Sequence, residues 1–190
     1  MNRFRILHFI LAIVFACGCS AHAQTHSSSG TIALESDPAP HMKVQILSQS
    51  PQETTYAVIF GKGDELMAGL IRFAQEKHLG ASRITGIGGI EDATIGFFEL
   101  AQKRHRPMLI NQQSEVLSLL GDIALFHGKP VVHLHMVVGF PDGSAHGGHL
   151  LSAHVWPTME VIVTEYQSAA MHKKLDAETG AALIDPSETQ

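Results

Sequence analysis

The chain has 190 residues, of which 45% are hydrophobic, and 13 Lys and Arg stand against 18 Asp and Glu, a net charge of -5 at pH 7. This acidic balance argues against nucleic-acid binding, because the phosphate backbone is attracted chiefly by clustered Lys and Arg. The length and the hydrophobic content are enough for one domain with a core.

The first 23 residues have the layout of a secretory signal peptide. Two arginines precede an apolar run from Ile6 to about Cys17, and Ala21-His22-Ala23 provides a small-residue cleavage site. The run is shorter than the roughly 20 apolar residues of a membrane-spanning helix, and no later stretch approaches that length. We therefore expect a signal peptide over residues 1–23 and a periplasmic or secreted protein without a membrane span.

Both cysteines of the chain, Cys17 and Cys19, lie in this first segment. A lipidated Cys19 that anchors the protein to a membrane is the alternative to a soluble product, although the residue three positions before it is Ala16 rather than Leu or Val. Cleavage at Ala23 leaves a chain without cysteine. Such a chain has no disulfide, thiolate metal site or cysteine nucleophile.

Flexible segments are expected on both sides of the folded part. Residues 24–41 are rich in Ser, Thr and Pro, a composition typical of a disordered tether. Residues 168–190 form a tail with one short helix that ends near Gly180. Within the domain, Asp64 is placed to cap a helix that ends before Gly80. The apolar face of this helix is Leu66, Leu70, Phe73 and Ala74.

The remaining segments of the domain have the composition and period of strands. They are residues 43–48, 55–63, 82–90, 93–100, 114–128, 130–140, 147–156 and 158–166. From residue 82 onward their connections are of turn length, which implies antiparallel pairing, because parallel neighbours need long crossovers. The expected fold class is α+β, a single domain with a mainly antiparallel β-sheet flanked by helices.

Histidines gather in one predicted hairpin of this sheet. His133 and His135 are two apart on a strand and therefore share a face. The turn signal Pro141-Asp142-Gly143 brings the chain back. If these three residues form the loop, His149 lies opposite His135, whereas a loop of two or four residues turns His149 to the other face unless a bulge at Gly147-Gly148 restores it.

With the three-residue loop, His133, His135 and His149 form a set of three neutral nitrogen ligands with room for a water. Such a set suits a transition metal ion, with zinc and iron expected first. The alternative is a group of structural histidines with satisfied hydrogen bonds. Glu160, on the following strand, is the candidate for a carboxylate that supports a ligand or acts as a base, or else it is a solvated strand glutamate.

Two further motifs have simpler explanations. Residues 86–90, Gly-Ile-Gly-Gly-Ile, lack the glycine spacing and the following helix of a phosphate loop, so close strand packing explains them better. Residues 103–107, Lys-Arg-His-Arg-Pro, are similar to the core of an AT-hook but have His where that motif has Gly. A basic hairpin turn is the expected structure there.

The order of these segments resembles the PPC ("plants and prokaryotes conserved") domain over residues 42–167. The most specific string is Leu-Leu-Gly-Asp-Ile-x-Leu, followed by His-x-His and Gly-Gly-His-Leu. The resemblance implies an antiparallel sheet flanked by helices and a tendency to form homotrimers, and it places the histidines of the bacterial pattern at His133, His135 and His149. It also implies DNA binding, which plant members combine with an AT-hook.

Three functions are open on this basis. The first is an exported, homotrimeric binding module that holds a transition metal or an unknown small ligand through the three histidines. The second is a metal-dependent hydrolase or oxygenase with the same site, although cupin-like oxygenases have a Glu a few residues after His-x-His, where this chain has Gly139 and Phe140. The third is DNA binding, which the export signal and the acidic balance disfavour.

Overall fold

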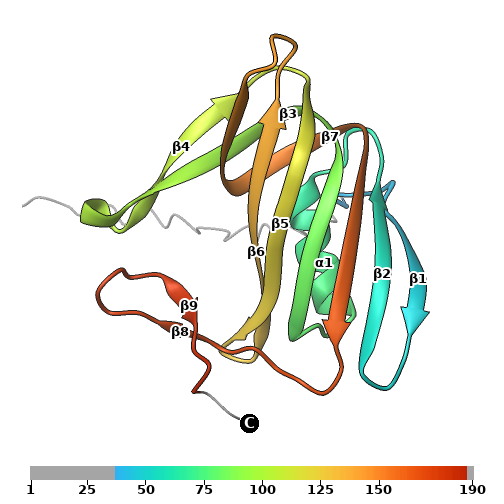
Figure 1. Cartoon of the computed structure of the whole chain (residues 1–190), viewed down its shortest axis with the longest axis vertical. Coiled ribbons are helices and arrows are strands. Elements are labelled where there is room, and N and C mark those ends of the chain that lie inside the picture. Colours follow the sequence, from blue (N-terminus) through green and yellow to red (C-terminus); the bar gives the residue numbers. More distant parts are fainter. Residues whose placement is uncertain (1–36, 188–190) are drawn as a thin grey trace, which may run out of the picture. The chain divides into compact units, whose positions relative to one another are not determined.

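The computed structural model describes residues 37–187, and antiparallel strands make up most of these residues. The sheet order is β1-β2-β7-β6-β5-β3-β4, and β7 pairs with β3 as well. The strands are β1 (Lys43–Gln49), β2 (Glu53–Phe60), β3 (Ala81–Glu99), β4 (Arg104–Ile110), β5 (Ser114–Phe126), β6 (Lys129–Gly139) and β7 (Ala145–Tyr166). The expected α+β class with a mainly antiparallel sheet is confirmed (Figure 1).

Two strands are longer than the sequence predicts. The predicted strands 82–90 and 93–100 join in β3, except that Leu100 begins a short 3-10 helix (Leu100–Gln102), and the predicted strands 147–156 and 158–166 join in β7. The charged residues between the first two segments suggest a turn, but Asp92 stays paired with His154 of β7. The interruptions are absorbed as register shifts near Ile90, which bend the two strands without ending them.

A single α-helix in the described residues, α1 (Leu66–Glu76), covers one face of the sheet (Figure 1). The predicted apolar face is confirmed, and its side chains are buried together with Leu134, Met136 and Val138 of β6. The cap differs from the prediction. Glu65 caps the helix by accepting hydrogen bonds from the amides of its first turn.

Asp64, the predicted cap, is fully buried just before the helix. Its carboxylate accepts hydrogen bonds from the amides of Gly61 at 2.9 Å and His41 at 3.0 Å. At the other end, the left-handed residue is His78, with φ of 54°, and not Gly80. The prediction that Asp64 caps the helix is therefore wrong, and the prediction that the helix ends before Gly80 is confirmed.

The segments around the domain are more structured than expected. Residues 37–41 of the predicted tether pack on α1, where Asp37 pairs with Arg72 and Ala39 is 1% exposed. The short helix near Gly180 is wrong, because the tail forms a hairpin of β8 (Lys173–Leu175) and β9 (Ala182–Ile184). The predicted signal peptide, the Cys19 anchor and tether residues 24–36 lie outside the described residues.

The two motifs set aside above lie in strands. Residues 86–90 are part of β3, and a Cβ on Gly89 would lie 2.3 Å from the carbonyl oxygen of Trp156. The prediction of close strand packing is thus confirmed. Of the basic segment, only Lys103, with φ of 51°, belongs to a turn, and the residues after it form β4. The described residues contain no helix long and apolar enough to cross a bilayer.

Strands β5 and β6 approach each other closely at Gly121. This residue pairs with Leu134, and a Cβ on it would lie 1.9 Å from the carbonyl oxygen of His133. Real Cβ atoms do not approach a backbone oxygen so closely, so any larger residue must displace β6. The glycine of the Leu-Leu-Gly-Asp string therefore permits the strand spacing beneath the histidines.

We expect Gly121→Ala to lower the free energy of unfolding by about 1–3 kcal/mol, the usual cost of overpacking a close contact. Gly80→Ala is the matched control, because its Cβ would meet Leu125 at an ordinary 3.5 Å. Urea unfolding of the two variants measures the difference. Equal stabilities would contradict the role assigned to Gly121.

Candidate metal site

The turn between β6 and β7 sets the register of the histidines. Phe140 and Ser144 close a three-residue loop, with a hydrogen bond of 2.9 Å from the amide of Phe140 to the carbonyl oxygen of Ser144. His135 consequently pairs with His149, as the sequence predicts for this loop length. The pairs continue without a shift through Gly147 and Gly148, so no bulge is needed.

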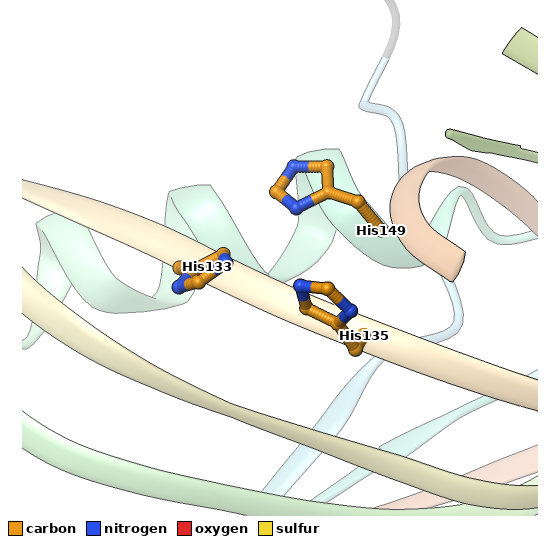
Figure 2. Close-up of side chains that lie close together, drawn as sticks. All are labelled: His133, His135 and His149. Carbon is orange, nitrogen blue, oxygen red and sulfur yellow. The ribbon is translucent and has the colours of Figure 1, made fainter. Parts of the chain in front are cut away.

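The three imidazoles lie around a common space, as Figure 2 shows. One ring nitrogen of each, from His133, His135 and His149, lies within 4.8 Å of the others. The ring centroids are 5.1 to 5.3 Å apart. His135 is exposed and the other two rings are half-buried, so the group is open on one side.

A carboxylate supports this group from the neighbouring strand. The Nδ1 atom of His133 lies 3.2 Å from Oδ2 of Asp122, which is directly opposite it on β5. This contact leaves Nε2 of His133 free to bind an ion. A carboxylate on the second nitrogen of a metal-binding histidine fixes the ring orientation and makes the ligand more basic.

Asp122 was missed at the level of the sequence, although a signal for it exists. The segment His127-Gly128 forms a two-residue turn in which both residues have positive φ, 51° and 74°. Such turns join antiparallel strands in a fixed register, here with Phe126 opposite Lys129. Counting back from this pair places Asp122 opposite His133.

Lys173 holds the Asp122 carboxylate in turn. Its Nζ atom lies 3.1 Å from Oδ1 of Asp122, and its side chain is 4% exposed. The lysine belongs to β8, so the C-terminal hairpin reaches the site. On the other side, the ring of His105 from β4 stacks on His149 with centroids 4.2 Å apart.

These neighbours change the titration of the site. Burial and the adjacent His105, His133, His135 and Lys173 lower the pKa of His149 to about 4. Burial and the same kind of charge repulsion also lower the pKa of His135. The low pKa keeps His149 neutral near pH 7, which is the form that binds a metal.

For Asp122, burial alone would raise the pKa of the carboxyl. The hydrogen bond with His133 and the charge of Lys173 outweigh burial and lower that pKa, so the group is a carboxylate. Its negative charge faces one imidazole and one ammonium group. The pair of Asp122 and Lys173 therefore adds no net charge beside the histidines.

Glu160 does not join the group. It is exposed and lies much farther along β7, where it pairs with Ile59 of β2 and Ile87 of β3. The prediction that it supports a ligand or acts as a base there is wrong, because bent β7 pairs with β6 only at its start and with β2 at its end. The carboxylate beside the ligands is Asp122.

The donor set fits a borderline transition ion. Three neutral imidazole nitrogens on two paired strands are typical ligands for zinc or iron. Bonds of about 2.0–2.1 Å would draw the rings closer together than they lie here, which side-chain rotation allows. Among the described residues, no further His, Cys, Asp or Glu joins the three histidines as a fourth ligand.

A pocket of about 790 Å³ lies over the three histidines. Its walls come from the end of β3, the start of β4, strand β6 and the C-terminal hairpin. This volume is in the range of small-molecule sites. The histidines are therefore accessible to a ligand larger than water.

Comparison with known families finds one match along most of the domain. The sequence model of the Plants and Prokaryotes Conserved (PCC) domain matches residues 47–167. The matched segment contains all three histidines and Asp122, and it ends before β8 and β9. No curated protein matches the chain.

Solved structures share the fold. A protein from Bacteroides thetaiotaomicron, whose description proposes DNA binding, is 28% identical with a TM-score of 0.68, over 76% of this chain and 96% of its own. A metal-containing protein from Archaeoglobus fulgidus is 28% identical, with a TM-score of 0.64 over 75% and 96%. A plant- and prokaryote-conserved protein from Pyrococcus horikoshii is 25% identical, with a TM-score of 0.66 over 79% and 98%.

In the metal-free protein, His149 should weaken the fold at acidic pH. Its pKa is about 4 in the folded state against 6.5 ordinarily. Between these values the unfolded chain binds a proton that the folded chain does not, so the free energy of unfolding decreases as the pH falls. His149→Asn should reduce this decrease between about pH 7 and pH 5, as urea unfolding measures.

His154→Asn is a matched control with the opposite sign. The hydrogen bond with Asp92 raises the pKa of His154 above 6.5. This contact stabilises the fold below pH 6.5 and is lost as the pH rises through the raised pKa. His154→Asn should therefore enlarge the decrease in the free energy of unfolding toward pH 5. If His149→Asn has the same pH dependence as the parent protein, the low pKa of His149 is contradicted.

Proposed function

Because this chain belongs to the Plants and Prokaryotes Conserved (PCC) domain family, we propose that it is a metal-binding module of that family. His133, His135 and His149 hold one transition ion, zinc or iron. The observation that carries this proposal is the set of three imidazole nitrogens within 4.8 Å of one another. The metal-containing relative from Archaeoglobus fulgidus supports it.

Each neighbouring residue has a defined task in this proposal. Asp122 holds the ring of His133 so that Nε2 faces the ion, and Lys173 holds Asp122 in turn. The low pKa of His149 keeps its nitrogen available. A bound ion would supply Lewis acidity at the open position, where a small ligand or a water can bind, so a hydrolase or oxygenase is the alternative within the same site.

Export and assembly are further parts of the proposal. The sequence pattern of residues 1–23 supports export to the periplasm or beyond. A homotrimer is supported by exposed apolar side chains that lie together over β3 and β5. These are Ile87, Leu117 and Leu120, each more than half exposed. Exposed apolar patches of this kind mark interaction surfaces.

DNA binding, which the description of the Bacteroides relative proposes, finds less support in this chain. Its net charge is -5, and Arg106, one of the basic residues of β4, pairs with Glu99 at 2.8 Å. Duplex binding that weakens steeply with salt would be the evidence for it. If duplex DNA does not bind the protein in a mobility-shift assay, metal binding remains the proposed function.

The metal site is tested by elemental analysis of the protein purified without a histidine tag or chelator. We expect about one zinc or iron per chain, and its loss in His135→Ala and His149→Ala, because each variant removes one of three ligands. Asp122→Asn should weaken metal binding by about 10–100-fold. Metal content that is the same in parent and variants would contradict the site.

His154→Ala is the matched control for this experiment. His154 is also a histidine of β7, but it pairs with Asp92 away from the three ligands. Its metal content should equal that of the parent. Loss of metal in this variant as well would point to general unfolding, which circular dichroism of the same samples distinguishes from loss of a ligand.

The trimer is tested by sedimentation equilibrium. We expect a trimeric parent protein and a monomeric Ile87→Glu variant, because a buried charge at an apolar interface is unfavourable. Leu47→Glu, at an exposed apolar residue of β1, should remain trimeric. A parent protein that is monomeric at micromolar concentration would overturn the proposed assembly.

A further inference from the structure

The C-terminal hairpin gives this chain a pocket wall that the matched family segment does not contain. The family match ends at residue 167, whereas Lys173 and residues 179–183 line the pocket over the histidines. The hairpin and the tip joining β3 to β4 project to the same side of the sheet (Figure 1). Their residues meet, since Nζ of Lys103 donates to the carbonyl oxygen of Ala177 at 2.9 Å.

The hairpin is also fixed at its base. The amide of Leu125 donates to the carbonyl oxygen of Met171 at 2.7 Å, and the ion pair of Lys173 with Asp122 lies just beyond. Because Asp122 contacts His133, the hairpin and the metal ligands share one polar network. The pocket is therefore a built feature of the folded chain.

The charge of this pocket is opposite to that of the protein. Lys103, Arg104 and Lys173 line it, and among the described residues that do so none is Asp or Glu. Asp122, just behind the histidines, is balanced by Lys173. Three neutral imidazoles would leave the full charge of a divalent ion uncompensated, so an anion is the complementary ligand.

Part of the pocket wall is apolar. Phe97, Leu100 and Leu183 line it and are 60%, 68% and 50% exposed. Exposed side chains of this size gain free energy when a ligand covers them, at about 25 cal/mol per Å². An inorganic anion would leave this surface in water, so the favoured ligand carries an apolar body as well as a charge.

We propose that the pocket binds a small organic carboxylate with an aromatic or aliphatic body. The carboxylate lies toward the metal ion and Arg104, and the body lies against Phe97, Leu100 and Leu183. An amino acid is disfavoured because its ammonium group would face the same cations. This proposal rests on the proposed metal site and adds the class of ligand, which the C-terminal hairpin helps to select.

Calorimetric titration of the zinc-loaded full chain tests the proposal with three probes. Benzoate has both the charge and the apolar body, acetate has only the charge, and benzamide has only the body. We expect benzoate to bind at least about tenfold more tightly than either of the others, which corresponds to roughly 1.4 kcal/mol. Equal affinities for benzoate and acetate would overturn the apolar part, and equal affinities for benzoate and benzamide the charged part.

Variants on the pocket wall locate the binding. Arg104→Gln should weaken benzoate about tenfold, the usual effect of removing one charged hydrogen bond. Leu183→Ser should weaken benzoate by a similar factor and leave acetate unchanged. Lys43→Gln, on β1 at the far edge of the sheet order, is the control that should leave all affinities unchanged. Parent-like benzoate affinity in both wall variants would overturn the assigned position.

Zinc content of the same samples separates the two proposals. Zinc at about one per chain with no preference for benzoate overturns the ligand class alone and leaves the metal site standing. A chain that binds no zinc overturns the metal site and, with it, this inference. Benzoate preference that disappears when zinc is removed supports both.

Discussion

The register of three paired strands, β5, β6 and β7, is the constraint on which the site depends. Two short turns set it: the two-residue turn at His127-Gly128 places Asp122 opposite His133, and the three-residue loop before Ser144 places His149 opposite His135. A shift of one residue in either hairpin would move these side chains to the opposite face. The same pairing buries Leu134 and Met136 beneath the histidines, so a shift would also expose core residues.

Two groups at the site lower the stability of the metal-free protein: an imidazole that resists protonation and a buried lysine. Burial and neighbouring positive groups hold the pKa of His149 near 4, which destabilises any protonated form of that ring. The ammonium group of Lys173 is almost fully buried and has Asp122 as its ion-pair partner. Strongly perturbed groups that converge on a pocket are typical of functional sites. An ion bound by the three imidazoles would gain from their neutrality.

The sequence predicts the parts of this structure that depend on local spacing. Alternation of apolar and polar residues gives the strands, and the loop length before Ser144 gives the pairing of His135 with His149. To predict Asp122 as a partner of His133, one must also know the register of the β5–β6 hairpin. The turn at His127-Gly128 sets that register, but the spacing of the histidines does not reveal it. Glu160 was misplaced because β7 bends away from β6 and carries its end to β2.

The C-terminal hairpin could not have been predicted in the same way. β8 and β9 have three residues each, too few for a periodic signal, and their position is set by long-range contacts of Lys173 with Asp122 and of Lys103 with Ala177. The family match ends before them, so the family model does not imply them either. Through these contacts the hairpin adds a wall to the pocket over the three histidines.

The central claim is that the three histidines hold a metal ion. The most direct measurement is an anomalous difference map from crystals of the protein purified without chelator, recorded at the absorption edge of the metal found in it. The account predicts one strong peak per chain, about 2.0–2.1 Å from a nitrogen of each of His133, His135 and His149. A well-ordered histidine group without a peak, or a peak elsewhere on the chain, would contradict it.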